Sequence, residues 1–214
     1  MPKVVDHESR RRMVAKVAFE TMESVGPERT SIREIARRGG FSHSLLSHYF
    51  RDSDEVFGFA YRHLTESVLE RVSERAAKLP KGIERLYASL DESCPYRLGV
   101  GAVATLSFWV HAVGNEHNRL MQKRSYGLWR KCLRKYIVEA IREGHVAPQM
   151  STDDLLNLTI MFLDGLCVAA VLEPSTWTRR KQVRLLDTFF VTCLAPQRPY
   201  ARRAARRWPK RSGK

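Results

Sequence analysis

Five polar side chains occur within seven residues of the sequence, at a spacing that places them together on one side of a helix. They are His43, Ser44, Ser47, His48 and Tyr49. A serine hydroxyl can donate or accept a hydrogen bond at the edge of a base, and the histidine and tyrosine side chains are long enough to reach phosphate oxygens. This combination favours hydrogen bonding to a nucleic acid, and we expect the five side chains to face outward.

The surrounding segment, Ser31–Phe50, carries the local signals of two short helices joined by a tight turn. Ser31 is a candidate N-cap, and Glu34 would complete a capping box by reaching back to the Ser31 backbone N–H. Gly39-Gly40 would end the first helix, because glycine adopts the left-handed conformation that a helix end requires. Ser42 is the candidate N-cap of the second helix.

The apolar residues of the same segment recur at helical spacing, on the side opposite to the polar ones. The residues expected in the core are Ile32, Ile35, Ala36, Phe41, Leu45, Leu46 and Phe50. One face that packs and one face that offers hydrogen-bonding groups to a DNA groove are what a helix-turn-helix needs.

The run Thr30–Phe57 resembles the helix-turn-helix signature of TetR-family transcriptional repressors. The residues that carry the resemblance are Thr30, Ile35-Ala36, Gly40-Phe41-Ser42 and His48-Tyr49-Phe50. The resemblance implies an all-α protein with an N-terminal three-helix helix-turn-helix head, a connecting helix and a C-terminal helical body for ligand binding and dimerisation.

We expect the DNA contacts to come from this motif and its flanks. The family usually places a phosphate-binding lysine just inside the fourth helix, where this sequence has Ser53, and Arg51 is the candidate replacement. Upstream, Lys3 and Arg10–Arg12 could form an arm on the DNA backbone or a solvated run of charge. The predicted DNA-binding residues are Thr30, Ser31, Arg33, Ser42, His43, Ser44, Ser47, His48, Tyr49 and Arg51.

The net charge of +14 and a pI of about 10.1 predict an anionic partner, either nucleic acid or an acidic membrane. The tail Gln197–Lys214 supplies eight of these charges and has no acidic residue, which leaves +6 for the rest. We expect the tail to be a disordered extension. The tail also keeps a second function open, that of a non-specific, architectural nucleic-acid-binding protein.

The rest of the chain has helical periodicity, and no segment alternates like a strand. Helices are expected at about 8–25, 54–79, 83–93, 96–114, 117–143, 152–172 and 176–194, with Ser53 capping the second of these. We divide the chain into a helix-turn-helix domain (1–53), a helical ligand-binding and dimerisation domain (54–196) and the basic tail (197–214).

The sequence offers little for catalysis. It has no GxSxG, glycine-rich phosphate loop or HExxH, and its histidines lack metal-ligand spacing, so we expect no enzyme, cofactor or metal. Four well-separated cysteines favour reduced core residues in a cytosolic protein. The apolar stretches Leu98–Val113 and Leu158–Leu172 fall short of the roughly 20 residues of a membrane span. We interpret both as buried helices.

The segments Ala104–Val113, His117–Arg134 and Leu158–Leu172 resemble BetI-type regulators, the TetR-family members that control conversion of choline to glycine betaine. The resemblance implies a pocket for choline or a related quaternary amine, with aromatic faces and a carboxylate around the cation. A core role for the same aromatic residues stays open, and Cys167 replaces a tryptophan that the type tends to have. The candidate ligand-binding residues are Phe108, Trp109, Tyr126, Trp129, Asp164 and Cys167.

The last two long helices, at about 152–172 and 176–194, are apolar over more than one face. In the family these helices form the interface of a homodimer, and burial within one subunit is the alternative. The expected protein is a cytoplasmic, nucleoid-associated homodimeric repressor that binds a roughly palindromic operator and is released by a small-molecule inducer.

Overall fold

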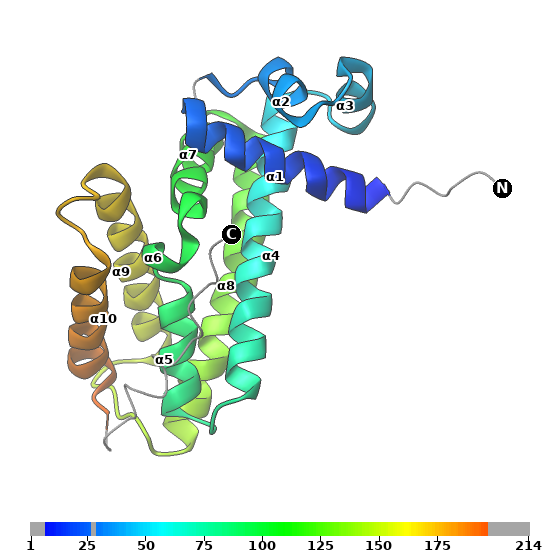
Figure 1. Cartoon of the computed structure of the whole chain (residues 1–214). Helices are drawn as coiled ribbons and strands as arrows, with labels where there is room; N and C mark the ends of the chain where they lie inside the picture. The colour runs from blue at the N-terminus through cyan, green and yellow to red at the C-terminus, as the bar shows by residue number, and fades with distance from the viewer. Residues whose placement is uncertain (1–6, 27–28, 197–214) are drawn as a thin grey trace. The chain divides into compact units, whose positions relative to one another are not determined.

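The computed structural model describes residues 7–26 and 29–196 of the 214-residue chain (Figure 1). All regular elements in these residues are helices, and the only β contact among them is an isolated antiparallel bridge between Val146 and Pro196. This confirms the expected all-α class. Two expectations lie outside the described residues: Lys3 as part of a DNA-contacting arm or of a solvated run of charge, and disorder of the tail at 197–214.

The chain forms two compact units. The first unit contains the residues up to Ser67 together with Leu98–Leu128, and the second contains Val68–Arg97 and the residues from Trp129 onward. Two long helices, α4 (Ser53–Ala77) and α8 (Glu116–Arg142), contribute residues to both. The predicted functional division at residues 53 and 196 stays a prediction.

The first unit begins with three helices, α1 (His7–Val25), α2 (Ile32–Gly39) and α3 (His43–Tyr49). They pack with the start of α4 around an apolar core, in keeping with the sequence pattern. Its least exposed residues include Val14, Ala15, Ala18, Ile35, Leu46, Phe50, Val56 and Ala60. Phe41 and Tyr49 are partly buried and pack against this core.

The helix ends of the motif follow the sequence signals, with one exception. The Ser31 Oγ accepts from the Glu34 backbone N–H at 3.2 Å, and the Ser42 Oγ accepts from the Leu45 N–H at 3.1 Å. Gly40 ends α2 in the left-handed region, with φ of 65°. The expected capping box is wrong in its second half, because the Glu34 carboxylate accepts from the Arg37 and Arg38 guanidinium groups instead.

The start of α4 corrects another expectation. The predicted cap, Ser53, is already the first helical residue, and the Asp52 Oδ1 accepts from the Glu55 backbone N–H at 2.9 Å. Asp52 is therefore the N-cap. The hydrogen bond from Glu55 lowers the pKa of the Asp52 carboxyl, and the neighbouring Arg51 lowers it further.

The helix expected at 96–114 is two helices. Gly99 has φ of 55°, a conformation that few residues other than glycine adopt, and it separates α6 (Pro95–Leu98) from α7 (Val100–Gly114). The break lies at the boundary between the two units, so that α7 belongs to the first unit.

Within the first unit, the N-terminal half of α4 packs closely along α7 and the start of α8. The Tyr61 and Phe108 rings stack with centroids 4.4 Å apart, and the Phe57 and His111 rings stack at 5.4 Å. Asn115 donates to the Asp54 carboxylate at 3.2 Å. These contacts tie α7 and the start of α8 to the helix that follows the motif.

The second unit contains α5 (Ile83–Glu92), the C-terminal half of α8, α9 (Thr152–Leu172) and α10 (Arg179–Leu194). Its core includes Tyr87 and Phe190, whose rings meet edge to face at 5.3 Å. A buried ionic cluster lies beside this core: Arg75 donates to Asp91 at 2.6 Å and to Glu92 at 2.8 Å.

Helix α9 is longer than the apolar stretch that we had considered, since it begins at Thr152 and has 21 residues. It is thus long and apolar enough to cross a membrane, with a mean hydropathy of 2.1 over its most apolar window. A core helix of a soluble protein has the same length and composition, and buried α9 residues such as Leu155 and Leu163 pack inside the second unit.

The four cysteines are free, as expected, but only Cys94 and Cys167 are buried, whereas Cys132 and Cys193 are half-buried. Burial raises the pKa of the Cys94 thiol, and a neighbouring Asp91 carboxylate raises it further. Two of the four are therefore partly accessible, not core residues.

Candidate DNA-binding and ligand-binding sites

The outer face of α3 presents four of the five polar side chains that the sequence singled out. His43, Ser44, Ser47 and His48 are exposed, while Leu46 on the opposite face is fully buried. The Ser47 Oγ lies 3.3 Å from the His43 Nδ1, and the Ser44 Oγ lies 3.1 Å from the Ser42 Oγ. The helix is thus held by its apolar side and capped at its start, with the hydroxyl and imidazole groups outward.

Tyr49 differs from the other four, because it is only half exposed and packs against the core. Its ring contacts the His48 ring at 5.1 Å and the His7 ring at 5.4 Å. His7, at the start of α1, is an addition to the group that the sequence pattern did not suggest, because α1 lies outside the motif.

The predicted DNA-binding residues that flank α3 differ in their exposure to solvent. Ser31, Arg33, Ser42 and Arg51 are exposed, so their side chains are accessible to DNA. Thr30 is only 4% exposed, and its hydroxyl donates to the Gly26 carbonyl at 2.7 Å. We therefore leave the Thr30 side chain out of the proposed DNA contacts.

Two arginine-rich segments nearby have distinct roles. Arg11 lies over the Phe50 and Phe59 rings at 4.8 and 4.6 Å and pairs with Glu55 at 3.2 Å, so it stabilises the first unit. On α2, Arg37 and Arg38 hold Glu34, and their hydrogen bonds lower the pKa of the Glu34 carboxyl to about 2. Arg10 and Arg12 are exposed.

Three of the candidate ligand residues belong to the first unit. Phe108 is 1% exposed and stacks on Tyr61, which is the behaviour of a core residue. Trp109 is half-buried, and its ring meets the Tyr126 ring edge to face at 6.3 Å.

The other three candidates belong to the second unit. The Trp129 indole N–H donates to the Ser93 Oγ at 3.2 Å. Asp164 is half-buried, and Cys167 is 5% exposed. Burial raises the pKa of the Cys167 thiol to about 12, with a further contribution from the Asp164 carboxylate.

Two residues that the sequence analysis overlooked have unusual environments. Asn118 and Gln122, one turn apart on α8, have buried amide atoms without a hydrogen-bond partner among the described residues. The Trp109 Nε1 is in the same situation. The signal was present as two amides at i and i+4 in a largely charged helix, but only burial distinguishes such amides from solvated ones.

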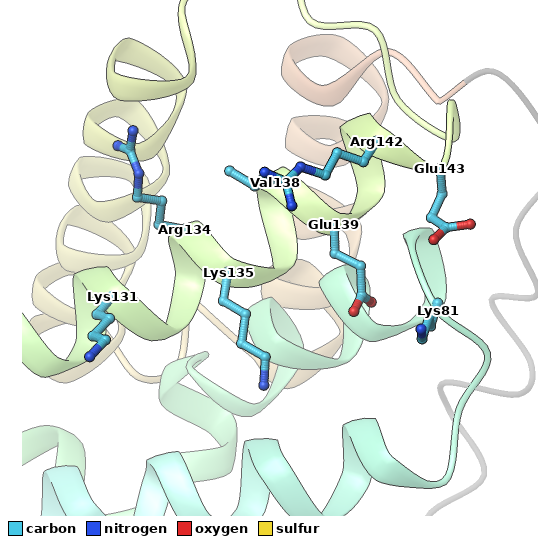
Figure 2. A pocket seen from close by; sticks show the side chains of 8 residues that line it. All are labelled: Lys81, Lys131, Arg134, Lys135, Val138, Glu139, Arg142 and Glu143. Carbon is cyan, nitrogen blue, oxygen red and sulfur yellow. The ribbon is translucent and has the colours of Figure 1, made fainter.

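A second feature that we did not anticipate is a groove of about 500 Å³ along the C-terminal half of α8 (Figure 2). Five basic side chains, two glutamates and Val138 line it. Glu139 accepts from the Gly82 N–H at 3.0 Å and faces Arg85, and Arg134 pairs with Asp153. The groove contains none of the candidate ligand residues, and its charges suit a solvated surface.

An exposed apolar strip runs along α9, where Leu158, Met161 and Leu172 are 43%, 68% and 69% exposed. Leu166, by contrast, is 4% exposed and is buried within the chain itself. An interface through α9 would thus use Met161 and Leu172, and a charge at Leu166 would disturb folding instead.

The described residues contain no group of three or more His, Cys, Asp or Glu side chains that could hold a metal ion. The buried acids that are present, Asp91 and Glu92, are neutralised by arginines. The exposed polar face of α3 remains the best-defined candidate site.

Comparisons with known proteins agree with this arrangement. Residues 15–58 match the family of bacterial regulatory proteins described as the TetR family, and residues 82–195 match the C-terminal region of BetI-type transcriptional repressors. The first match spans α2 and α3, and the second covers more than half of the chain.

The chain is 28% identical over 201 residues to the transcriptional regulator BetI of Escherichia coli, covering 90% of this chain and 97% of that protein. It is 28% identical over 177 residues to the regulator PksA of Bacillus subtilis, covering 81% and 84%. Both relatives are helix-turn-helix-type regulators of transcription.

Among solved structures, a putative transcriptional regulator from Saccharomonospora viridis in complex with choline has a TM-score of 0.79 and 18% identity, covering 89% of this chain and all of that one. The regulator FadR of Bacillus subtilis, in complex with stearoyl-CoA, has a TM-score of 0.71 and 15% identity, covering 85% and 97%. At these identities the likeness establishes the fold alone. With the two family matches it leads to one conclusion: the chain belongs to the TetR family of transcriptional regulators and has a C-terminal region of the BetI type.

Proposed function

We propose that this regulator is a cytoplasmic homodimeric repressor that places α3 of each subunit in the major groove of one half of a roughly palindromic operator. The observation that carries the proposal is the outward face of α3, with Ser44 and Ser47 exposed on a helix whose other face holds the fully buried Leu46. Small hydroxyls allow the helix to approach the base edges, and His43, His48 and the flanking groups contact phosphates.

The direct test is Ser44→Tyr, compared with Ser73→Tyr at an exposed position of α4. The first change should weaken operator binding, measured by fluorescence anisotropy on a footprinted site, by about 1–3 kcal/mol for each base that the helix can no longer reach. Both proteins should remain folded, because both serines are exposed. Equal operator affinity of the Ser44→Tyr variant and the unchanged protein would contradict the assignment.

The dimer would form through α9 and α10, whose exposed apolar residues include Met161 and Val191. Met161→Glu should yield monomers in analytical ultracentrifugation at micromolar concentration. Val110→Glu is the matched control, because Val110 is similarly exposed, at 69%, but lies on α7. If the Met161→Glu variant remained dimeric, the interface would not lie at Met161. Half-sites on the operator should lie about 34–36 Å apart.

The inducer that we propose is choline or a related quaternary amine, on the strength of the BetI-type match and of the choline complex of the S. viridis protein. Trp109 and Tyr126 of the first unit would offer ring faces and edges to the ligand. The second-unit candidates, Trp129, Asp164 and Cys167, stay predictions from the resemblance.

A chain truncated after Pro196 would test the alternative, architectural function. Removal of the eight basic residues should lower affinity for any DNA and flatten its salt dependence, by about 0.9 in slope for each phosphate that is no longer neutralised. An operator-specific repressor keeps its preference for operator over random DNA after the truncation. Loss of nearly all binding together with that preference would favour the architectural function.

A further inference from the structure

Three side chains on α7 and α8 hold buried polar atoms that no described residue satisfies. They are the Trp109 Nε1, both polar atoms of the Asn118 amide, and the Gln122 Oε1. Asn118 is 0% exposed. Nearly all buried polar atoms in proteins have a partner, and each exception requires an explanation.

The three residues belong to one region of the first unit. Asn118, Gln122 and Tyr126 follow one another at intervals of four along α8, which places them on the same face of the helix. Trp109 of α7 meets this face, because its ring contacts the Tyr126 ring. The residues that carry the unpartnered atoms are therefore Trp109 of α7 and two residues on the face of α8 that Trp109 meets through Tyr126.

The neighbouring polar groups show that the region can satisfy its own hydrogen bonds. Asn115, three residues before Asn118, donates to Asp54 and accepts from the Asn118 backbone N–H at 3.1 Å. Thr105 on α7 donates to the Gly101 carbonyl at 2.7 Å. Against these completed pairs, the open atoms of Trp109, Asn118 and Gln122 stand out, and the only other such atom among the described residues is the Arg11 Nε of α1, whose guanidinium pairs with Glu55.

The set also has a defined chemistry. It offers donors from the Trp109 indole and the Asn118 amide, and acceptors from Asn118 and Gln122. The buried polar residues described in the first unit are all uncharged, whereas the buried Arg75, Asp91 and Glu92 are in the second. A neutral group that both donates and accepts, such as an alcohol hydroxyl or a primary amide, matches this set, and an ionised group does not.

We propose that Asn118, Gln122 and Trp109 bind the neutral hydroxyl or amide end of the inducer. This rests on the proposed function, in that it assumes a small-molecule inducer, and it specifies the chemistry of one end of that molecule. In choline the group would be the hydroxyl, and a quaternary amine without a hydroxyl would be a poorer ligand.

The position of Asn118 provides a route from this site to the DNA-binding helices. A Cβ atom at Gly58 of α4 would lie 3.5 Å from the Asn118 Oδ1 and 2.8 Å from the Met121 Sδ, so α8 lies directly against α4. The next residue, Phe59, contacts Phe50 at the end of α3, with ring centroids 5.7 Å apart. A ligand group that is hydrogen-bonded to Asn118 would therefore lie beside Gly58 of α4, next to the residue through which α4 contacts the end of α3.

The first experiment measures unfolding temperatures of the full-length protein with Asn118→Leu and Gln122→Met, which keep side-chain size and remove the polar atoms. Neither variant should unfold below the unchanged protein, because no internal hydrogen bond is removed. Gln182→Met is the matched control: its amide donates to the Trp177 carbonyl at 2.7 Å and accepts from the Tyr96 N–H at 3.0 Å. It should unfold about 3–6 °C lower. A comparable decrease in Asn118→Leu and Gln122→Met would overturn the proposal, since their amides would then have internal partners.

The second experiment compares choline with ethyltrimethylammonium, which has the same cation and no hydroxyl, by calorimetry. The unchanged protein should bind choline at least about tenfold more tightly. Asn118→Leu and Gln122→Met should bind the two with nearly equal affinity. A preference for choline that survives both substitutions would overturn the proposal.

A third measurement tests the site at Asn118, Gln122 and Trp109 independently of whether choline is the inducer. If the unchanged protein binds neither amine, choline is excluded, and acetamide and ethylene glycol replace it as neutral probes. The Trp109 indole N–H signal, assigned with Trp109→Phe, should shift on titration with these probes, and Asn118→Leu should abolish the shift. No shift with either probe would overturn the inference whatever the inducer is.

Discussion

Arg75 in the second unit and Asn118 in the first are both buried, at 5% and 0% exposed, yet their environments are opposite. Arg75 donates to two carboxylates, and Asp91 accepts further bonds from Arg97 and from the Tyr96 hydroxyl. Asn118 has neither amide atom satisfied by a described residue.

The difference follows from the free energy of burying each kind of group. An unpaired buried charge costs several kcal/mol, so a stable fold must surround it with counter-charges. An unpaired buried amide costs about 1–3 kcal/mol, which a domain of this size tolerates if function requires it. The completed polar cluster around Arg75 therefore fits a structural role, and the open uncharged atoms around Asn118 are the ones for which we propose a ligand.

Removal of the Arg75 guanidinium should have the largest effect on stability, and it tests the structural role of the buried ionic cluster. Arg75→Met should lower the free energy of unfolding by about 3–5 kcal/mol, because it leaves buried carboxylates with fewer counter-charges. Urea denaturation measures the effect. Arg134→Met is the control: its pair with Asp153 is exposed, so the expected decrease is below about 1 kcal/mol. Similar decreases in the two variants would break the comparison, since burial would then not matter.

Asp52 extends the comparison to a satisfied polar group at a helix end. Asp52→Ala should cost about 1 kcal/mol of stability at neutral pH, because α4 loses its N-cap. The pKa of Asp52 is lowered in the folded protein, so its contribution is complete above the unfolded pKa and is lost as pH falls through the folded one. Urea titrations at neutral and acidic pH should show that the free energies of unfolding of Asp52→Ala and of the unchanged protein become equal in acid. A constant difference down to low pH would place the cap elsewhere.

Local sequence signals predicted the helix-turn-helix because its determinants are local. Ser31, Ser42 and Gly40 act on backbone groups within a few residues, and the apolar spacing of Ile35 and Leu46 decides which face is buried. The predictions were wrong where neighbouring residues could each fill the same structural role, such as that of a helix cap. Asp52 and Ser53 can both cap α4, and the exact start of the helix selects Asp52.

The proposed ligand site was predictable only in part. The aromatic pair Trp109 and Tyr126 followed from the resemblance, and the structure does bring the two rings together. Asn118 and Gln122 could not be selected, because the sequence contains other amides, such as Gln182, which is buried like Asn118 but whose nitrogen and oxygen both have hydrogen-bond partners.

Most of the helices, the caps of α2 and α3 and the polar face of α3 followed from the sequence alone, because propensity, capping and amphipathic spacing act over a few residues. The positive charge that favours DNA is likewise a property of composition. Three features became visible only in the folded chain: Thr30 is buried, Met161 and not Leu166 is exposed on α9, and Asn118 finds no partner among the described residues. Each of these depends on which distant helix packs against the residue, and that packing is a property of the whole fold.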